Sequence, residues 1–392
     1  MSFTPLAGDF YNLEGQLEPH ELEYLMAIRR YLETEVKPVL TEYWEKAEFP
    51  RAIVKGLSNV GVLGMAAEET WKIPTTAVLR GWVAVELARI DASVATFVGV
   101  QNGLAMGSIE LCGSPEQRAK WLPGMAAGDI IGSFGLTEPL SGSDSARGLR
   151  TTAERQGDTW VINGEKRWIG NSTWGDMCVI WAKDVADNQV KGFIVPTSTP
   201  GFVAEKIENK ISLRIVQNGH ITMTDVHVPD ENHLVHANSF ADTAKVLRHT
   251  RGEVAWESVG LAMGAYEAAL AYAKEREQFG KPIAAHQMVQ DLLVSSLSNI
   301  TASLAMVREA SKMYDAGTQT DEQASMAKLT ATVLMRETVA KCREVVGGNG
   351  IVTDYDVARF FADAEALYSY EGTREMNTLI IGRAITGHAA FV

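Results

Sequence analysis

The chain has 392 residues, 46% of them hydrophobic and 22% charged, so it can bury a large core and is long enough for two or three domains. Its formal net charge of -13 argues against a nucleic-acid-binding function, because proteins of that class need a basic face to displace counterions from phosphates. No apolar run approaches the roughly 20 residues that a spanning helix needs, which argues against insertion into a membrane.

The first third of the chain is predicted to be helical. Apolar residues recur at helical spacing over residues 18–44, and Pro38 predicts a break or kink near the end of that stretch. Further helices are predicted over residues 76–90, 92–111 and 115–124.

The pattern changes to strands at about residue 133. Residues 158–169 (DTWVINGEKRWI) predict two strands around an Asn163-Gly164 turn, which is the strongest short-range signal for a hairpin. More strands are predicted over residues 177–182, 192–195, 203–207 and 221–228, separated by Gly, Pro, Asn and Asp.

After Pro229 the pattern returns to long helices, predicted over residues 254–276, 286–316 and 321–346. The last begins with Thr320 and Gln323 at capping-box spacing and ends on Gly347-Gly348. We therefore predict an α+β fold with an N-terminal helical domain (residues 1–132), a middle β-barrel or sandwich (133–240) and a C-terminal four-helix bundle (241–392).

Cysteine usage and the N-terminus indicate an intracellular protein. The cysteines, Cys112, Cys178 and Cys342, are odd in number and far apart, so neither a disulfide framework nor a cysteine metal site is supported, and we expect reduced core residues. The N-terminus lacks the basic-then-apolar order of a secretion signal. We expect a cytoplasmic protein if the source is bacterial and an organelle matrix otherwise.

The stretch with the clearest chemistry is residues 368–374 (YSYEGTR). Glu371 could act as a base between Tyr368 and Tyr370, which would limit water, while Gly372 lets backbone approach a ligand and Thr373 offers a hydroxyl. On composition alone, a Glu-Gly pair that ends a surface helix is the more ordinary interpretation of this stretch.

Three further stretches suggest a bound cofactor. Residues 134–144 (FGLTEPLSGSD) could offer backbone N-H groups and hydroxyls to a flat ring and phosphates, and residues 167–172 (RWIGNS) place an indole where it could wall one face of a ring. Residues 276–282 (REQFGKP), Gln287 and residues 344–350 (EVVGGNG) could hold phosphate or ribose at helix ends. Taken singly, these are also typical of a strand-to-loop junction, a buried hairpin tryptophan and plain helix caps.

Taken together, the motifs LTEPLSGSD, KRWIGNS, RxQFGxP, VVGGNG and YEGT make the chain resemble the acyl-CoA dehydrogenase and acyl-CoA oxidase flavoproteins over nearly its whole length. Within that superfamily it resembles the glutaryl-CoA dehydrogenase branch, which includes short-chain acyl-CoA oxidases of peroxisomes. The resemblance implies one FAD per subunit, an acyl-CoA substrate, and electron-transferring flavoprotein or O2 as the electron acceptor. It also implies a homotetramer built as a dimer of dimers, with no bound metal.

The resemblance also implies roles for individual residues. Glu371 would take the α-proton of the acyl group while a hydride leaves the β-carbon for flavin N5, and Ser143, Arg251 and Gly372 would contact the substrate. The positions that match those holding FAD within one subunit are Phe134, Leu136, Thr137, Gly142, Ser143, Trp168, Ile169, Gly170, Thr373 and Glu375. The positions that match those reaching a neighbouring subunit's FAD are Arg276, Phe279, Gln287, Glu344, Gly347 and Gly348.

Some relatives carry the base on the helix that holds Arg251, immediately before it, where this chain has Thr250. A threonine cannot serve as that base, and Glu253 is more simply a solvated or paired helix residue, so Glu371 remains the predicted base.

Two departures from the family pattern bear on specificity. Glutaryl-CoA enzymes use an Arg for the distal carboxylate where this chain has Ala95, and no Arg or Lys lies between Arg89 and Arg118. At the position of Gly170, many dehydrogenases of the family have Thr or Ser, and the hydroxyl of that residue forms a hydrogen bond with flavin N5. The sequence thus favours dehydrogenation of short, uncharged acyl-CoA thioesters. A short-chain acyl-CoA oxidase, a glutaryl-CoA dehydrogenase and a non-catalytic FAD-binding relative remain as alternatives.

Overall fold

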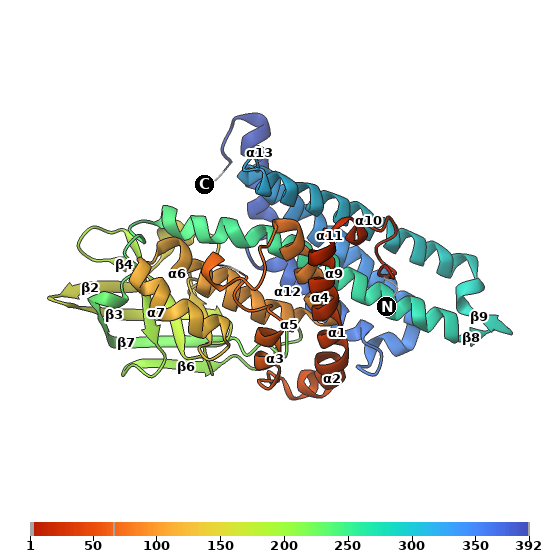
Figure 1. Ribbon diagram of the computed structural model, residues 1–392, viewed down its shortest axis with the longest axis horizontal. Helices are drawn as coiled ribbons and strands as arrows, with labels where there is room; N and C mark the ends of the chain where they lie inside the picture. Colours follow the sequence, from red (N-terminus) through yellow and green to blue (C-terminus); the bar gives the residue numbers. More distant parts are fainter. Residues whose placement is uncertain (1–3, 66, 391–392) are drawn as a thin grey trace.

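The computed structural model describes residues 4–65 and 67–390, apart from the side chain of His249. Helices come first, a curled mixed sheet follows, and long helices complete the chain, which confirms the predicted order of the three parts (Figure 1). The N-terminal helices are α1 (Pro19–Tyr31), α2 (Lys37–Lys46), α3 (Ile53–Asn59), α4 (Ala77–Ile90), α5 (Ala92–Val98), α6 (Gly107–Cys112) and α7 (Pro115–Ala126).

Two of the predicted N-terminal helices are interrupted by π-helical turns. The segment Leu32–Val36 joins α1 to α2, and Pro38 lies in the first turn of α2, where its missing N-H costs no hydrogen bond. The segment Gly99–Met106 joins α5 to α6 in the same way. π-helical turns often occur at functional sites, and the second of these contributes to the site described below.

The middle part is a seven-stranded sheet in the order β1-β4-β2-β3-β7-β6, with β5 also paired to β4. Its β1–β4 and β2–β4 pairs are parallel and the other pairs are antiparallel. The strands are β1 (Gly132–Gly135), β2 (Thr152–Gln156), β3 (Thr159–Ile169), β4 (Met177–Asp184), β5 (Val190–Pro196), β6 (Phe202–Lys206) and β7 (Gly219–Pro229), and a short helix α8 (Ser145–Gly148) follows β1.

The hairpin turn predicted at Asn163-Gly164 is wrong. Strand β3 runs straight through both residues, with a bulge against β7 at that point. The actual turn lies one strand earlier, where Gly157, with φ 64°, joins β2 to β3. Gly164 is needed for a different reason, because a Cβ there would lie 2.6 Å from the Cα of Thr151.

The C-terminal part is built around one long helix. Helix α9 (Phe240–Glu275) packs against α10 (Gln287–Asp315), α11 (Asp321–Val346) and α12 (Val357–Ser369), and α13 (Arg374–Thr386) packs on α11. The two-stranded ribbon of β8 (Glu277–Gln278) and β9 (Lys281–Pro282) follows α9, at the end of the molecule opposite the sheet (Figure 1). Helix α9 begins at Phe240, well before the predicted residue 254, and its first turns already carry Phe240, Ala244 and Leu247 at helical spacing, which the prediction passed over.

The largest core lies where α4 crosses α9. Every residue of α4 from Gly81 to Ile90 is buried, so this helix is covered on all sides and is shared by the N-terminal part and the bundle. The three cysteines are buried and unpaired, as predicted. Among the described residues no helix is both long and apolar enough to cross a membrane.

Candidate active site

Glu371 lies in the short connection between α12 and α13, in an unusual backbone conformation. Its φ is 54° and that of Gly372 is 84°, so two consecutive residues are left-handed. For a glutamate this costs about 1–2 kcal/mol, so other contacts must hold it. Lys328 of α11 donates from Nζ to the carbonyl oxygens of Gly372 (2.8 Å) and Tyr368 (3.3 Å). Asn377 of α13 also donates to Gly372, at 2.8 Å, so two helices clamp the loop.

One oxygen of the Glu371 carboxylate is held by α9. The Thr250 hydroxyl lies 3.0 Å from Oε2 and can donate to it, the Leu247 carbonyl at 3.2 Å being its alternative acceptor. Burial raises the pKa of Glu371, and the Thr250 hydrogen bond and the charges of Arg251 and Lys328 oppose the rise. A carboxylate with a raised pKa is a stronger base than a solvated one, as removal of a weakly acidic proton requires.

Two further glutamates of α9, one turn apart, lie near Glu371. Tyr370 donates a hydrogen bond to Glu257 at 2.8 Å. Burial and the nearby charge of Glu253 raise the pKa of Glu257 to about 8, while burial, opposed by Arg80, raises the pKa of Glu253 to about 7. Glu257 therefore keeps its proton at neutral pH, which lessens the repulsion on Glu371.

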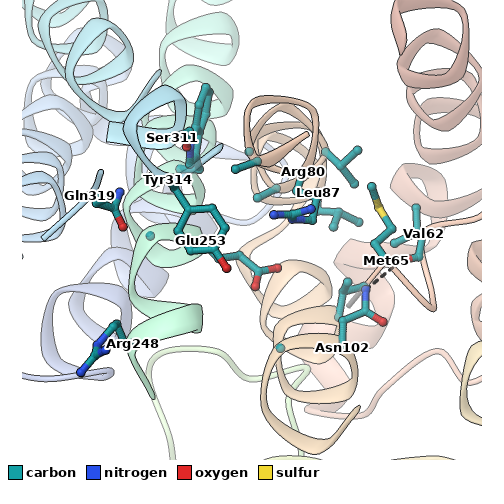
Figure 2. A pocket seen from close by; sticks show the side chains of 18 residues that line it. Val62, Met65, Arg80, Leu87, Asn102, Arg248, Glu253, Ser311, Tyr314 and Gln319 are labelled. Atoms are coloured by element: carbon teal, nitrogen blue, oxygen red, sulfur yellow. Dashed lines mark hydrogen bonds between the residues drawn. The ribbon is translucent and has the colours of Figure 1, made fainter. Parts of the chain in front are cut away.

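Glu253 is not the solvated or paired residue that its sequence context suggested. It is half-buried and lines a cavity of about 80 Å³ between α4, α9 and α10 (Figure 2). Within the described parts of the chain its carboxylate forms neither a hydrogen bond nor an ion pair. The cavity also takes in Arg80 of α4, which the argument from Ala95 overlooked.

A second, larger cavity of about 550 Å³ lies where the first turns of α9 and α11 meet α13. Three arginines line it, Arg248, Arg251 and Arg383, together with Asp321 and Glu322. Arg248 lines both cavities, so the two are neighbours. Arg251 also acts electrostatically on Glu371, which places the base near both.

The loop after β1 is pinned to β3 by a buried ion pair. Lys166 Nζ donates to Glu138 at 2.8 Å and to the Leu136 carbonyl at 3.1 Å, and it is fully buried. Glu138 also accepts the backbone N-H groups of Arg150 (2.7 Å) and Thr151 (3.0 Å). This pair fixes the predicted cofactor loop, although sequence reasoning assigned neither of its residues a role.

The end of β3 presents an aromatic ring and an open backbone. Trp168 has φ 67° and is 52% exposed, although it belongs to a strand whose Ile169 is buried. Gly170 does not have a positive φ, and a Cβ there would lie 3.3 Å from Val100 Cγ2. The glycine is therefore not required by a left-handed turn.

These stretches converge over the π-helical segment Gly99–Met106. Val100 faces Gly170, and one turn later Gly103 faces α9, where a Cβ would lie 2.7 Å from Thr250 Cγ2 and 3.1 Å from Glu253 Oε2. Thr250 in turn contacts Glu371. The end of β3, which is predicted to hold a flat ring, is thus separated from the predicted base Glu371 only by the π-helical segment Gly99–Met106 and Thr250.

The remaining predicted residues of this group differ in how free they are to bind a cofactor. Phe134 and Leu136 are buried at the end of β1, whereas Gly142 and Ser143 are exposed and a Cβ at Gly142 would meet no atom within 4 Å. The open loop, the half-exposed indole and the clear space at Gly142 fit a flat ring with a phosphate tail. Thr373 already caps α13 through Met376 N at 3.3 Å, and Glu375 is exposed and paired with Arg374.

The other predicted group lies elsewhere. All six residues are exposed: Arg276, Phe279, Gln287, Glu344, Gly347 and Gly348. The first three lie along the segment that contains the ribbon β8–β9 and the start of α10, and the other three lie where α11 ends. The 36-residue helix α9 is about 54 Å long, and Arg251 is near its start whereas Arg276 follows its end. The chain does not bring this group together with Glu371.

Sequence reasoning missed several residues of the site. Lys328 could have been found from the sequence. It falls within the stripe of small residues that α11 buries (Ala324, Ala327 and Ala331), where a charged side chain is unexpected unless it has a partner. Arg80 and the pairing of Thr250 with Glu371 gave no such signal, since each depends on how distant helices pack.

Family models match each part of the chain. They describe the acyl-CoA dehydrogenase N-terminal domain (residues 18–129), middle domain (133–226) and C-terminal domain (240–386). An acyl-CoA dehydrogenase of Bacillus subtilis (strain 168) is 32% identical over 92% of this chain and 96% of that protein. The mitochondrial short-chain specific acyl-CoA dehydrogenase of Mus musculus is 31% identical over 90% of this chain and 87% of that protein.

Solved structures agree with these sequence relatives. A glutaryl-CoA dehydrogenase from Mycobacterium smegmatis in complex with FADH2 has a TM-score of 0.95 at 35% identity, covering 99% of this chain and 100% of that one. The butyryl-CoA dehydrogenase from Megasphaera elsdenii has a TM-score of 0.89 at 28% identity, covering 98% and 100% of the two chains. The chain therefore belongs to the acyl-CoA dehydrogenase family of FAD-dependent oxidoreductases.

Proposed function

We propose that the protein dehydrogenates short acyl-CoA thioesters whose acyl group carries no charge, with Glu371 as the base that removes the α-proton. The observation that carries this proposal is the geometry of Glu371, a half-buried carboxylate with raised pKa on a clamped loop, hydrogen-bonded to Thr250, whose neighbours on α9 line the two cavities. When bound, FAD supplies the acceptor for the hydride that leaves the β-carbon.

Glu371 would serve the reaction through its backbone as well as its carboxylate. Among the described residues its N-H finds no hydrogen-bond acceptor, and the left-handed conformation is kept by Lys328 and Asn377. We infer that this N-H donates to the thioester carbonyl oxygen, where negative charge develops as the α-proton leaves. Thr250 orients the carboxylate, and Tyr370 limits access of water.

The two cavities suit the two halves of the substrate. In the larger one, Arg251 and Arg383 offer positive charge to the phosphates of CoA, while Arg248 is paired with Asp321 at 2.6 Å. The smaller one receives the acyl chain, and Glu253 within it would repel a distal carboxylate and so oppose its attraction to Arg80. Ser143 and Gly372 remain proposed substrate contacts.

Residues of the β1 loop and the end of β3 would hold FAD within the subunit. The exposed group around Phe279 would complete the cofactor site of a second subunit, so we infer a homotetramer that is a dimer of dimers. Electron-transferring flavoprotein is the proposed electron acceptor. An oxidase that uses O2 is the second candidate, because Gly170 brings no hydroxyl to the ring that Trp168 is proposed to wall.

The test is anaerobic titration of the flavin-loaded protein with a panel of acyl-CoA thioesters, followed by admission of air. We expect butyryl-CoA to bleach the flavin absorbance and glutaryl-CoA to do so poorly. Slow recovery of the absorbance in air supports a dehydrogenase, whereas recovery within a turnover supports the oxidase. Preferential bleaching by glutaryl-CoA with release of CO2 would contradict the proposed specificity.

A further inference from the structure

Two arginines and one glutamate line the smaller cavity, and Arg248 is already paired with Asp321 at 2.6 Å, whereas Arg80 and Glu253 do not pair with each other. Figure 2 shows Arg80, from α4, and Glu253, from α9, projecting into it. Arg80 donates from Nη1 to the backbone and hydroxyl oxygens of Thr75, both at 3.1 Å. Across the described residues, Arg80 Nε and Nη2 have no acceptor, and no ion pair within 4 Å joins Arg80 to Glu253.

The side chains around this pair are mostly apolar. The larger apolar side chains of the lining are Val62, Met65, Val83, Leu87, Val98 and Trp256. An alkyl tail inserted among them would displace water from Arg80 and Glu253 and leave a donor and an acceptor unsatisfied, which is costly in a poorly hydrated site. The cavity is therefore badly matched to a plain hydrocarbon chain.

The polar pair is close to the proposed reaction centre. Glu253 lies one turn after Thr250 on α9, a rise of about 5 Å, and Thr250 contacts the Glu371 carboxylate. Both α9 side chains face the Cβ-less surface of Gly103. An acyl group whose α-carbon meets Glu371 can thus pass Gly103 and place its far end at Arg80 and Glu253.

Charge then decides which end group fits. A carboxylate would pair with Arg80 but be repelled by Glu253, and an ammonium would pair with Glu253 but be repelled by Arg80. An uncharged group with both a donor and an acceptor satisfies both residues at once.

We propose that the acyl group of the physiological substrate ends in an uncharged hydrogen-bonding group, a carboxamide or a hydroxyl, which bridges Arg80 and Glu253. This inference rests on the proposed function and narrows its substrate class. Arg80 and Glu253 are then the residues that determine specificity, while Glu371 performs the chemistry.

Binding to the FAD-loaded Glu371→Gln protein tests the proposal without turnover. Three thioesters of the same length and nearly the same shape are compared by calorimetry: 4-carbamoylbutyryl-CoA, glutaryl-CoA and 5-methylhexanoyl-CoA. We expect the carboxamide to bind at least about tenfold more tightly than either of the others, since a site built for hydrogen bonds rejects an analogue that lacks them.

Variants in the same background identify the residues responsible. Adding Arg80→Leu and Glu253→Leu should make 5-methylhexanoyl-CoA the tighter ligand, and Arg80→Met alone should already reduce the preference if the double variant folds poorly. The matched control replaces the exposed pair Lys120 and Glu231, 3.0 Å apart, by leucines and should keep the original order.

Each outcome bears on the proposal. Equal or tighter binding of 5-methylhexanoyl-CoA would overturn it, as would tightest binding of glutaryl-CoA, which would mean that Arg80 captures a carboxylate beside a protonated Glu253. An unchanged order in the leucine variants would also overturn it. Failure to bind any of the three would instead remove the proposed function itself.

Discussion

Gly170 is where the choice of electron acceptor can be tested, because its backbone tolerates a side chain. Since its φ is not positive, Gly170→Thr should fold and keep FAD after a small movement of Val100, the nearest neighbour at 3.3 Å. We expect the variant to be reduced by substrate at a similar rate but reoxidised by O2 roughly 3- to 10-fold more slowly, the kinetic equivalent of one hydrogen bond. Stopped-flow reoxidation under air measures this.

Gly170→Val is the matched control, because valine has the shape of threonine without its hydroxyl. If both variants slow reoxidation equally, filled space is the cause; if only threonine does, the hydroxyl is the cause. Equal rates of flavin reoxidation in all three proteins at full FAD occupancy would show that Gly170 does not control the reaction of the flavin with O2.

Glu257 should make stability fall as pH rises. Its pKa is raised from 4.5 to about 8, so between these values the folded protein keeps a proton that the unfolded chain has released. The folded state is therefore progressively destabilised as pH rises through this window. Glu257→Gln keeps an acceptor for Tyr370 but cannot ionise. It should lose less stability than wild type between pH 5.5 and 8.5, by on the order of 1–3 kcal/mol.

Urea denaturation of the two FAD-loaded proteins at both pH values measures this difference. Glu23→Gln, on the exposed face of α1, serves as the control for removal of a carboxylate. Parallel pH profiles for wild type and Glu257→Gln would show that Glu257 is ionised in the folded protein.

The chemical role of a single residue could be predicted only where the residue belongs to a recognisable sequence motif. Glu371 and Trp168 stand in short stretches whose residue types suggest a base and a ring wall. Arg80 and Glu253 stand in ordinary helical sequence, and they acquire meaning only because α4 and α9 cross beside a cavity. Such placement depends on tertiary packing, which local pattern does not encode.

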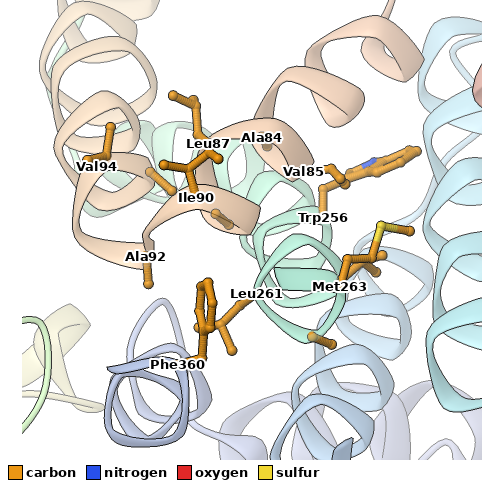
Figure 3. Close-up of a cluster of buried hydrophobic side chains, with 14 of the residues drawn as sticks. Ala84, Val85, Leu87, Ile90, Ala92, Val94, Trp256, Leu261, Met263 and Phe360 are labelled. Carbon is orange, nitrogen blue, oxygen red and sulfur yellow. The ribbon is translucent and has the colours of Figure 1, made fainter. Parts of the chain in front are cut away.

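Buried side chains of α4 and α9, among them Ala84, Val85 and Trp256, gather where the two helices cross (Figure 3). The crossing depends on glycines that let the two backbones approach. A Cβ at Gly260 would lie 2.4 Å from the Val85 carbonyl oxygen and 2.8 Å from its Cα, so backbone must move. Gly260→Ala should therefore destabilise the protein by about 1–3 kcal/mol.

Gly252→Ala, on the same helix, is the control for this substitution. A Cβ there meets no atom within 4 Å, so the better helix propensity of alanine should raise stability by roughly 0.5–1 kcal/mol. Opposite signs in urea denaturation are expected. A stabilising effect of Gly260→Ala would mean that the backbones of α4 and α9 leave room for a Cβ at this crossing.

Helices and strands were predicted well where the apolar pattern continues over many residues. They were predicted poorly where a glycine could indicate either a turn or a close contact between backbones. Gly164 resembles a turn residue, but its role is to admit Thr151 of the neighbouring segment, and the true turn uses Gly157. The start of α9 was missed although a capping box at Ser239 and Asp242 is followed by Phe240, Ala244 and Leu247 at helical spacing. Only for Gly164 does the deciding contact lie outside the local pattern.

The assembly should depend on the exposed end of the bundle. Phe279 is 94% exposed, with Met288 at 82% and Ile351 at 74%, and a 3.1 Å hydrogen bond from Asn349 to Tyr272 keeps the Ile351 segment beside the end of α9. An apolar group of this kind is typical of an interface. Phe279→Asp should therefore give a smaller assembly with less bound FAD.

Light scattering and the ratio of flavin to protein absorbance measure both effects. Phe10→Asp, at a position 69% exposed, is the control for adding a charge at an exposed phenylalanine. Unchanged mass and FAD content in Phe279→Asp would show that the second subunit does not complete the cofactor site through this residue.

The most direct test is the rate at which butyryl-CoA reduces the bound flavin in wild type and in Glu371→Gln under anaerobic stopped flow. The amide keeps the size, the backbone N-H and the Thr250 contact but cannot accept the proton. We predict full FAD content, retained thioester binding and a loss of at least ~10³-fold in the rate of flavin reduction. Reduction of the variant at a rate near that of wild type would contradict the assignment of Glu371 as the base.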